Sequence, residues 1–525
     1  MLPQLPVSES SYGPLPIGRR AARVAVLGAV FICAACGLVY ELALIALGSY
    51  LVGNDINQTS IVLSVFVASM GLGAMTAKRL QHRPIEAFAV VESLLALLGG
   101  LSVLALYAAF AWLDLYQPAL VAFSVVIGGF IGAEIPLLMT LIQRIHRQEA
   151  GDAASDLFAA DYIGALVGGL AFPFLLLPFF GQLQGALVVG VLNVLAALMV
   201  AGWLFGRQVG RRQRGMLAAL FFGVLIALGT AGRLADDFEV SARQALYDDP
   251  IVTHERSAYQ EIVLTQAGRR GDLRLYLNGD LQFSSVDEYR YHEALVHPAM
   301  TGRRERVLVL GGGDGLALRE VLRYPDVGSV VLVELDPKVI AVARSDSRLA
   351  RLNAGALDDP RVRVVTADAF SWLRTQQERF DVAIVDLTDP DNAATAKLYS
   401  VEFYTMLSTA LERDARAAIQ AGSPYFAPEA FWCVGATLEA AGLQTTPYQV
   451  EVPSFGSWGF HLAERTTSPS LRLPEPVPPA LRFLDDATLA AAGVFPRDRQ
   501  PRPVDASTLM RPKILDYQRE AWRSY

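Results

Sequence analysis

The sequence predicts two different halves: an N-terminal multi-pass α-helical membrane domain, and a C-terminal doubly wound α/β domain preceded by a small β unit. Hydrophobic residues make up 53% of the 525 residues and charged residues only 18%, which is few for a wholly soluble globule. Nearly all long apolar runs lie between residues 24 and 233, whereas short apolar strands alternate with helical patterns after residue 286. The net charge of −7 argues against a nucleic-acid binder, whose footprint is basic.

The membrane domain, 24–233, follows a basic N-terminal segment, 1–23, and contains about seven apolar segments. A segment of roughly 17–25 apolar residues is long enough to cross the hydrocarbon core of a bilayer. We therefore expect a multi-pass protein that has the lipid bilayer as a partner. The segments lie near 24–51, 59–77, 86–110, 118–142, 156–180, 184–205 and 216–232.

The positive charges of the loops predict an orientation. Arg19, Arg20 and Arg23 precede the first segment, and basic loops then alternate with loops that carry no Lys or Arg. By the positive-inside rule the N-terminus and the basic loops face the cytoplasm, so seven spans would place the second half outside. The seventh segment, 216–232, would cover only about 25 Å of a roughly 30 Å core. We expect that this segment does not cross the bilayer, or that another long run is a broken pair. The number of spans is then even, and the second half lies in the cytoplasm.

Ionisable and sulfur-bearing residues inside the apolar runs are candidates for function. Charges are costly in lipid, so each acid there either serves a function or pairs with neighbours and fixes the packing. Cys33 and Cys36 form a Cys-X-X-Cys pattern, but small residues at that spacing in such a helix are more often packing contacts. The spacing of the three cysteines and six histidines predicts no metal site. The acids are Glu41, Glu92, Glu134 and Asp161.

The second half begins with a small β unit, 245–285, in which segments 251–264 and 273–278 are expected to form a hairpin. A helical pattern follows at 287–301. The region 286–466 then alternates short strands with helices, which predicts a Rossmann-like parallel sheet. A Pro- and Arg-rich tail, 467–525, is expected to wrap its surface. The predicted strands are 307–310, 330–334, 362–366, 382–386 and 417–420.

Glycines and acids follow the ends of these strands, where open α/β sheets bind ligands. The first strand runs into the turn 311–315 (Gly-Gly-Gly-Asp-Gly), which lets the backbone approach a ligand closely. The second strand ends about 20 residues later in Glu334, a carboxylate placed to hold both hydroxyls of a ribose. Asp368 follows the third strand, where an adenine amino group could be read. Together these residues predict an adenosine-containing ligand.

The remaining acids of this edge indicate the charge of the ligand. NAD and S-adenosylmethionine derivatives both suit a glycine-rich turn with a ribose-binding acid. Asp314, Asp386 and Asp389 would crowd the pocket with negative charge, which disfavours a pyrophosphate or a carboxylate and favours a cation. A sulfonium nucleoside with an amine tail, together with a polyamine co-substrate, would meet this condition.

Three further motifs carry a family resemblance. They are 259–262 (Tyr-Gln-Glu-Ile), 277–282 (Leu-Asn-Gly-Asp-Leu-Gln) and 287–293 (Asp-Glu-Tyr-Arg-Tyr-His-Glu), followed by the glycine-rich turn. Over about 250–465 the chain resembles the spermidine synthase family of polyamine aminopropyltransferases. With its membrane half it resembles the membrane-anchored bacterial branch of that family, which implies a multi-pass enzyme of the bacterial cell (inner) membrane.

The resemblance implies transfer of the aminopropyl group of decarboxylated S-adenosylmethionine to an amine such as putrescine, giving spermidine and methylthioadenosine. Decarboxylated S-adenosylmethionine is then a substrate, and no cofactor or metal is expected. Two alternatives stay open: an S-adenosylmethionine-dependent methyltransferase, against which Asp314 speaks, and a polyamine transporter or sensor whose soluble domain only binds ligand. A homodimer also stays open.

The resemblance also implies a role for each site residue, and it shows where the chain departs from the family. The amine half differs, because Leu387 and Thr388 stand where the family has two serines and Phe455 stands where it has a tyrosine. The acceptor amine is therefore open. The implied roles are proton acceptor for Asp386, nucleoside binding for Gln260, Glu334, Asp368 and Ala369, and amine binding for Tyr291, His292, Asp314 and Asp389.

Overall fold

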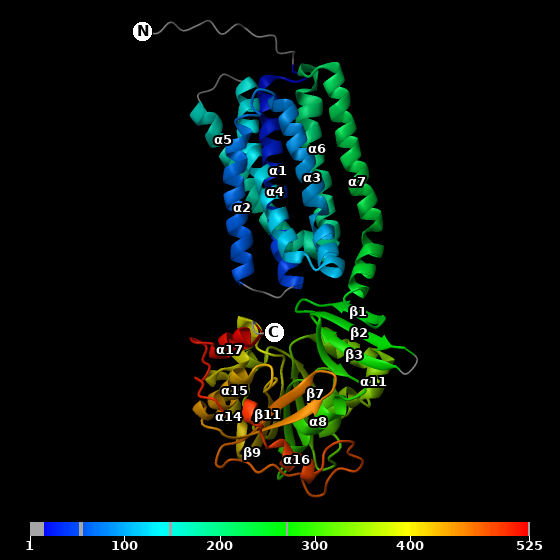
Figure 1. Ribbon diagram of the computed structural model, residues 1–525, viewed down its shortest axis with the longest axis vertical. Coiled ribbons are helices and arrows are strands. Elements are labelled where there is room, and N and C mark those ends of the chain that lie inside the picture. Colours follow the sequence, from blue (N-terminus) through cyan, green and yellow to red (C-terminus); the bar gives the residue numbers. More distant parts are fainter. Residues whose placement is uncertain (1–14, 52–55, 146–149, 269–270, 523–525) are drawn as a thin grey trace. The chain divides into compact units, whose positions relative to one another are not determined.

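The computed structural model describes residues 15–51, 56–145, 150–268 and 271–522. The chain forms two compact units that divide between Asp248 and Asp249, a helical unit and an α/β unit (Figure 1). The fold class predicted from the sequence is thereby confirmed for a helical first half and an α/β second half. Most of the basic segment 1–23 and the tip of the predicted hairpin turn lie outside the described residues.

The helical unit consists of long apolar helices (Figure 1). Among the described residues, six stretches are long and apolar enough to cross a membrane, judged by length and composition alone. One of them, Ala154–Leu204, spans 51 residues and includes most of α5 and all of α6, and it is interrupted at Gly181, whose φ of 71° is not helical. The helices are α1 (Arg19–Leu51), α2 (Ile56–Ala77), α3 (Pro84–Ala108), α4 (Tyr116–Ile145), α5 (Ala150–Ala171), α6 (Leu177–Ala197) and α7 (Arg211–Gln244).

The length of α7 corrects one expectation. The sequence predicts 216–232 as the shortest apolar segment, but the helix that contains it runs through 34 residues, Arg211–Gln244. At ~1.5 Å per residue, this helix is about 51 Å long. Hydropathy detects only the apolar middle of a helix, whereas the backbone hydrogen bonds continue through Asp236, Asp237 and Glu239. The length of α7 is therefore no reason to exclude it from the helices that could cross a membrane.

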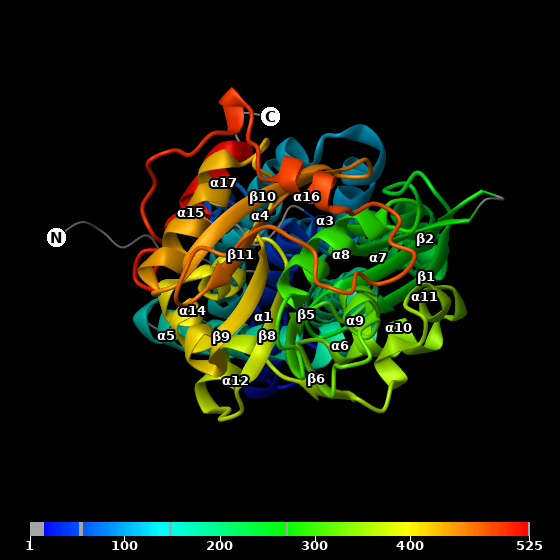
Figure 2. The same cartoon turned by 90° about the horizontal axis from the view of Figure 1, so that it is seen from below.

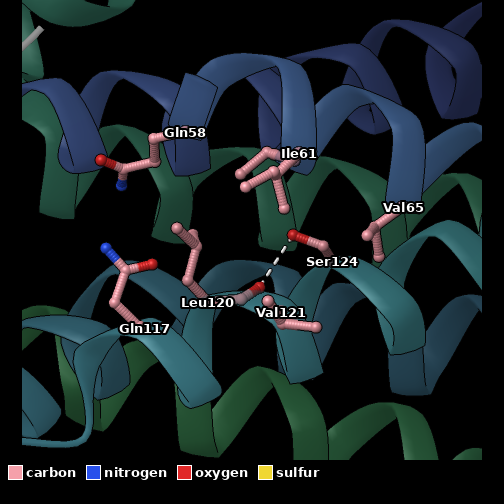
Figure 3. Close-up of a pocket in the computed structure, with 8 residues that line it drawn as sticks. Gln58, Ile61, Val65, Gln117, Leu120, Val121 and Ser124 are labelled. Atoms are coloured by element: carbon pink, nitrogen blue, oxygen red, sulfur yellow. Dashed lines mark hydrogen bonds between the residues drawn. The ribbon is translucent and has the colours of Figure 1, made fainter. Parts of the chain in front are cut away.

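Small residues bring α2 and α4 into close contact. A β-carbon added at Gly132 would collide with the carbonyl oxygen of Met70, and one added at Gly73 would collide with that of Gly129. The Ser124 hydroxyl is satisfied within its own helix, because it donates to the Leu120 carbonyl at 2.8 Å. Figure 3 shows a hollow beside this contact. Its lining residues are Gln58, Ile61, Val62, Val65, Gln117, Leu120, Val121 and Ser124.

The small β unit is a four-stranded antiparallel sheet in the order β1-β2-β3-β4, which is more than the single predicted hairpin. The sequence treats 251–264 as one strand, but a turn divides it, and the Ser257 hydroxyl accepts from the backbone N–H groups of Tyr259 and Gln260 at 3.0 Å each. This turn places Gln260 at an end of the sheet. The strands are β1 (Ile251–Arg256), β2 (Glu261–Ala267), β3 (Asp272–Leu277) and β4 (Asp280–Ser284).

The main sheet has seven strands in the order β10-β11-β9-β8-β5-β6-β7. The five predicted strands are present and parallel, and their order reverses between β5 and β8, as at the switch point of a Rossmann-like fold. The hairpin β10-β11 adds an antiparallel edge that the sequence reading missed. The strands are β5 (Arg306–Gly311), β6 (Ser329–Glu334), β7 (Val362–Thr366), β8 (Phe380–Asp386), β9 (Leu411–Gln420), β10 (Gln444–Val452) and β11 (Gly456–Glu464).

Helices cover both faces of this sheet (Figure 2). Side chains alternate along each buried strand, so Val307 and Val309 join one core and Leu308 and Leu310 join the other. The first core includes α8 (Glu288–Val296), α9 (Leu316–Val321), α10 (Pro337–Ser345), α11 (Ser347–Leu352) and α16 (Asp486–Ala492). The second includes α12 (Ala369–Thr375), α13 (Ala393–Ala396), α14 (Val401–Ala410), α15 (Pro428–Ala440) and α17 (Lys513–Trp522).

Candidate functional site

The predicted site residues gather at the carboxyl edge of the parallel strands. Strand pairing sets Gly311 of β5 directly opposite Asp386 of β8, and Glu334 of β6 opposite Thr366 of β7. The Ala367 N–H donates to the Glu334 carbonyl at 3.0 Å, which holds the segment leading to Asp368 beside the end of β6. Residues from four separate strands therefore reach one edge.

The turn after β5 passes between two of these acids and needs glycine to do so. Gly311, Gly312 and Gly315 have φ angles of 78°, 64° and 83°, a region that favours glycine. A β-carbon at Gly311 would collide with the Asp386 carbonyl oxygen, and one at Gly313 would lie 2.8 Å from a carboxylate oxygen of Glu334. The turn therefore leaves no room for a side chain on the backbone between these carboxylates.

Glu334 ends β6 and accepts a hydrogen bond from the Asp336 N–H at 2.9 Å. Burial is the main cause that raises the pKa of the Glu334 carboxyl to about 7, and the negative charge of Asp314 adds to the rise. A carboxylate held in this way gains most from a ligand that donates hydrogen bonds to it, as a ribose diol does.

Gln260 reaches this part of the site through Asp336. Its side-chain amide donates to an Asp336 carboxylate oxygen at 3.1 Å, and the Ser257 hydroxyl donates to the same oxygen at 2.7 Å. The sequence reading missed Asp336, which is buried and caps α10 by accepting from the Lys338 N–H at 2.9 Å. An acid followed by proline at a helix start was the available signal. Gln260 and Glu334 thus lie at the same end of the site.

Asp368 caps α12, whose first residue is the buried Ala369. The Asp368 carboxylate accepts from the Ser371 hydroxyl at 2.7 Å and forms an ion pair with Lys397 at 3.0 Å. Burial alone would raise the pKa of Asp368, but these hydrogen bonds outweigh it and lower the pKa. Lys397, which the sequence reading did not assign, therefore reaches the position predicted to face adenine.

Asp386 ends β8, and one of its oxygens accepts a hydrogen bond from the Tyr291 hydroxyl at 2.6 Å. Burial is the first cause that raises the pKa of the Asp386 carboxyl to about 6, and the charge of Asp314 raises it as well. Burial likewise raises the pKa of Asp314, whose carboxylate accepts from the Leu316 N–H at 2.8 Å. These two predicted acids therefore influence each other's protonation.

Glu288, which is ion-paired with Arg319, interacts with Nδ1 of the His292 ring. Its Nδ1 lies 2.8 Å from the Glu288 carbonyl oxygen and 2.9 Å from the Glu288 carboxylate, and Arg319 donates to both carboxylate oxygens at 3.0 and 2.9 Å. Burial would lower the pKa of His292, but the Glu288 hydrogen bond outweighs it and raises the pKa. The sequence reading missed Glu288 and Arg319, because this pairing joins α8 to α9.

Asp389 follows β8 in the turn that leads to Pro390. Burial raises the pKa of its carboxyl to about 6, and the charge of Asp280 contributes to the rise. The Gln420 side-chain amide donates to Asp389 at 3.3 Å. Among the described residues, no lysine or arginine contributes to the pKa shift of Asp386 or of Asp389, and the charge of His292 is the one basic influence on Asp386.

An aromatic wall stands beside these acids. The Tyr291 ring lies 6.1 Å from the Phe455 ring and 6.4 Å from the Trp458 ring, and the last two are 5.0 Å apart. The Trp458 indole N–H donates to Gln420 at 3.3 Å, which links this wall to Asp389. The arrangement combines acids for a cation with ring faces for its methylene groups. The sequence reading did not assign Trp458.

Comparison with known proteins gives consistent matches for this chain. The family described as "Spermine/spermidine synthase domain" matches residues 288–473. Polyamine aminopropyltransferase 1 of Streptomyces coelicolor is 58% identical over 510 residues, which cover 96% of each chain. Polyamine aminopropyltransferase of Mycobacterium tuberculosis is 49% identical over 95% of this chain and 97% of its own. A crystal structure of spermidine synthase in complex with the transition-state analogue AdoDATO covers 47% of this chain and 85% of its own, with 26% identity and a TM-score of 0.44.

Proposed function

This chain belongs to the polyamine aminopropyltransferase family, and on that premise we propose which residues perform the transfer. The chain is a transferase of the spermidine synthase type, as its sequence resemblance predicts. We propose that decarboxylated S-adenosylmethionine and an amine such as putrescine bind at the carboxyl edge of the sheet, and that spermidine and methylthioadenosine leave it.

The single observation that carries this assignment is the pair Asp386 and Asp389, on which no lysine or arginine acts among the described residues. Asp386 and Asp389 have pKa values raised by burial and by neighbouring acids, so a cation that binds beside them removes an unfavourable charge accumulation. Asp314 favours the decarboxylated nucleoside over S-adenosylmethionine, because the methionine carboxylate would meet another negative charge there. The methyltransferase alternative is accordingly disfavoured.

In the proposed reaction, the amine nitrogen attacks the aminopropyl carbon next to the sulfonium. The new C–N bond forms as the C–S bond breaks, and the electron pair of that bond stays on sulfur in neutral methylthioadenosine. The attacking ammonium must first lose a proton, which Asp386 accepts directly or through water. The Tyr291 hydroxyl occupies one Asp386 oxygen at 2.6 Å and leaves the other for this proton.

The binding roles divide between the two ends of the site. Glu334 holds the ribose, and Gln260 fixes the adjoining Asp336 against the nucleoside end. Asp368 and Ala369 face the adenine. The Asp368 carboxylate, which is already ion-paired with Lys397, then also accepts a hydrogen bond from the adenine.

The amine end takes the charged and apolar parts of the acceptor separately. Asp389 holds the distal ammonium, and Phe455 and Trp458 contact the methylene chain between the two nitrogens. Asp314 and His292 line the pocket near the reacting end, where Glu288 fixes the imidazole. The acceptor is therefore putrescine or a related polyamine.

We place the chain in the cell (inner) membrane as a multi-pass protein, with lipid around the helical unit. Because the α/β unit resembles an enzyme whose nucleoside substrate is made in the cytoplasm, we propose that it faces the cytoplasm. The loop charges argue the other way if α1 to α7 all cross, since an odd number of spans puts the α/β unit outside. A cytoplasm-dependent reporter fused after Tyr525 should be active and an export-dependent phosphatase inactive. The reverse pair of results would contradict the proposal.

Product analysis of the purified full chain tests the function itself. The protein is incubated with decarboxylated S-adenosylmethionine and a panel of amines, and the products are identified by mass spectrometry. We expect methylthioadenosine and an aminopropylated amine in equal amounts. Methylated amines after incubation with S-adenosylmethionine would support the methyltransferase instead. Ligand binding without any product would support a transporter or sensor.

A further inference from the structure

Three potential metal ligands lie together inside the helical unit. In the sequence they are far from the residues of the candidate site. Cys33 of α1, Glu92 of α3 and Glu134 of α4 each offer a ligand atom, and these atoms lie within 4.8 Å of one another. The exposed fractions of the three residues are 0%, 0% and 2%. A single ion placed among them could contact all three after small side-chain movements. We call these residues the Cys33 cluster.

Several oxygens at the Cys33 cluster lack hydrogen-bond donors. One carboxylate oxygen of Glu92 and one of Glu134 have no partner among the described residues. Asn193 of α6 is fully buried and donates to the other Glu92 oxygen at 2.9 Å, yet its own side-chain carbonyl oxygen is also unpartnered. Buried polar groups are normally satisfied, so two unpartnered carboxylate oxygens in one cluster indicate a missing partner.

The charge of the Cys33 cluster identifies the class of that partner. Among the described residues, no lysine or arginine acts on Glu92 or Glu134. A Cys33 thiolate, formed when the thiol proton leaves, and one ionised carboxylate together balance a divalent cation, and the second carboxyl keeps its proton, so the enclosed site is neutral. The Cys33 thiol hydrogen-bonds to Glu92 and to Glu134, and once deprotonated a thiol is a strong ligand for soft and borderline metals. One sulfur and two carboxylate ligands therefore suit zinc better than an ammonium group.

We infer that the Cys33 cluster binds a divalent transition-metal ion of the zinc class, with Cys33, Glu92 and Glu134 as its ligands. Asn193 positions Glu92 through its hydrogen bond, as outer partners of metal ligands commonly do. Sequence spacing could not reveal this site, because the ligands come from three helices and no two of them share a local motif. Binding would cross-link α1, α3 and α4 inside the helical unit.

Cobalt titration of the full chain in detergent tests this inference, since Co²⁺ reports a thiolate ligand by its charge-transfer absorption. The protein carries no histidine tag and is first stripped with a chelator. We expect one Co²⁺ per chain, displaced by Zn²⁺, together with the thiolate absorption band. Cys33→Ser should abolish the band, and Glu134→Gln should weaken Co²⁺ binding at least tenfold.

Two matched variants control for general effects of substitution. Cys36→Ser changes the neighbouring cysteine, whose thiol lies 3.6 Å from the Val189 carbonyl oxygen, and it should keep the band. Glu41→Gln changes an acid of α1 outside the Cys33 cluster and should keep the affinity. If Glu134→Gln does not fold, loss of the band in Cys33→Ser with retained band in Cys36→Ser still supports the site. Wild-type protein without bound Co²⁺, or with a band unaffected by Cys33→Ser, overturns the inference. Binding of spermidine but not of Co²⁺ would do so as well.

Discussion

The helical unit and the α/β unit both contain carboxylates on which no lysine or arginine acts among the described residues, but they enclose them differently. Glu92 and Glu134 lie between helices with 0% and 2% of their surfaces exposed. Asp386 ends β8 and Asp389 follows it, and both are partly exposed at the edge where α/β sheets bind ligands. An enclosed pair of acids can retain one cation as long as the protein stays folded, whereas acids at a strand end can exchange a cation at every turnover. We propose that the acids serve assembly in the helical unit and chemistry in the α/β unit.

The largest expected effect is on turnover, which should depend on an acid of the α/β unit and not on an acid of the helical unit. Asp386→Asn removes the proton acceptor and should reduce turnover by a factor on the order of 10²–10⁴. Methylthioadenosine binding should stay nearly intact in calorimetry. Glu41→Gln, an acid of the helical unit, should keep wild-type turnover. Unchanged turnover in Asp386→Asn would assign the proton acceptor to another group.

The pH dependence of kcat/KM should follow the raised pKa of Asp386, which lies at about 6 in the ligand-free protein. A carboxyl accepts a proton only when it is ionised, so kcat/KM should fall about tenfold per pH unit below about 6. This acid limb should be absent from the residual activity of Asp386→Asn. A value that stays constant down to pH 5 would contradict the assignment. The measurement is kcat/KM between pH 5 and 8, because this ratio reports ionisations of the free enzyme.

A smaller effect is expected at the nucleoside end of the site. Glu334→Gln replaces a charged acceptor by a neutral amide and should weaken methylthioadenosine binding by about 1.5–3 kcal/mol. Glu305→Gln, an exposed acid paired with Arg303 on the same unit, is the matched control and should bind normally. Equal affinity of Glu334→Gln and wild type in calorimetry would remove Glu334 from the ribose site.

The smallest effect concerns stability and follows from the raised pKa of Asp389, about 6 against an ordinary value near 3.8. The folded state binds this proton more tightly than the unfolded state, so the contribution of Asp389 to stability falls as pH rises from about 4 to about 6. Asp389→Asn should therefore raise the unfolding temperature at pH 7.5, by a free energy on the order of 1 kcal/mol. The difference from wild type should shrink at pH 5. A lower unfolding temperature for the variant at pH 7.5 would show that Asp389 stabilises the ligand-free fold.

Local sequence patterns predicted the parts of this molecule that depend on local forces. Short apolar runs located the five parallel strands, and the residues after them located the acids, because parallel strands bring their carboxyl ends to one edge. The β10-β11 hairpin was missed, although Tyr448, Val450 and Val452 alternate with polar residues in the pattern typical of a half-buried strand. The extent of α7 was wrong because hydropathy ignores polar helix ends.

Other parts of the site depend on contacts between residues far apart in the chain, which carry no local signal. Gln260 meets Asp336 across two sheets, and Arg319 meets Glu288 across two helices. Lys397 reaches Asp368 from a position 29 residues further along the chain. The sequence shows each of these residues singly, but their pairing is known only from the folded structure.

The crowding around Gly311 has a consequence for the genetics of this chain. Every other amino acid brings a β-carbon to a position already filled by the Asp386 carbonyl oxygen. Gly223 of α7 has open space at the same atom. In a saturation library selected for growth without external polyamine, codon 311 should return glycine alone, while codon 223 tolerates many residues. The contact of one β-carbon with one carbonyl oxygen thus decides whether a cell that carries a substitution at this codon can grow.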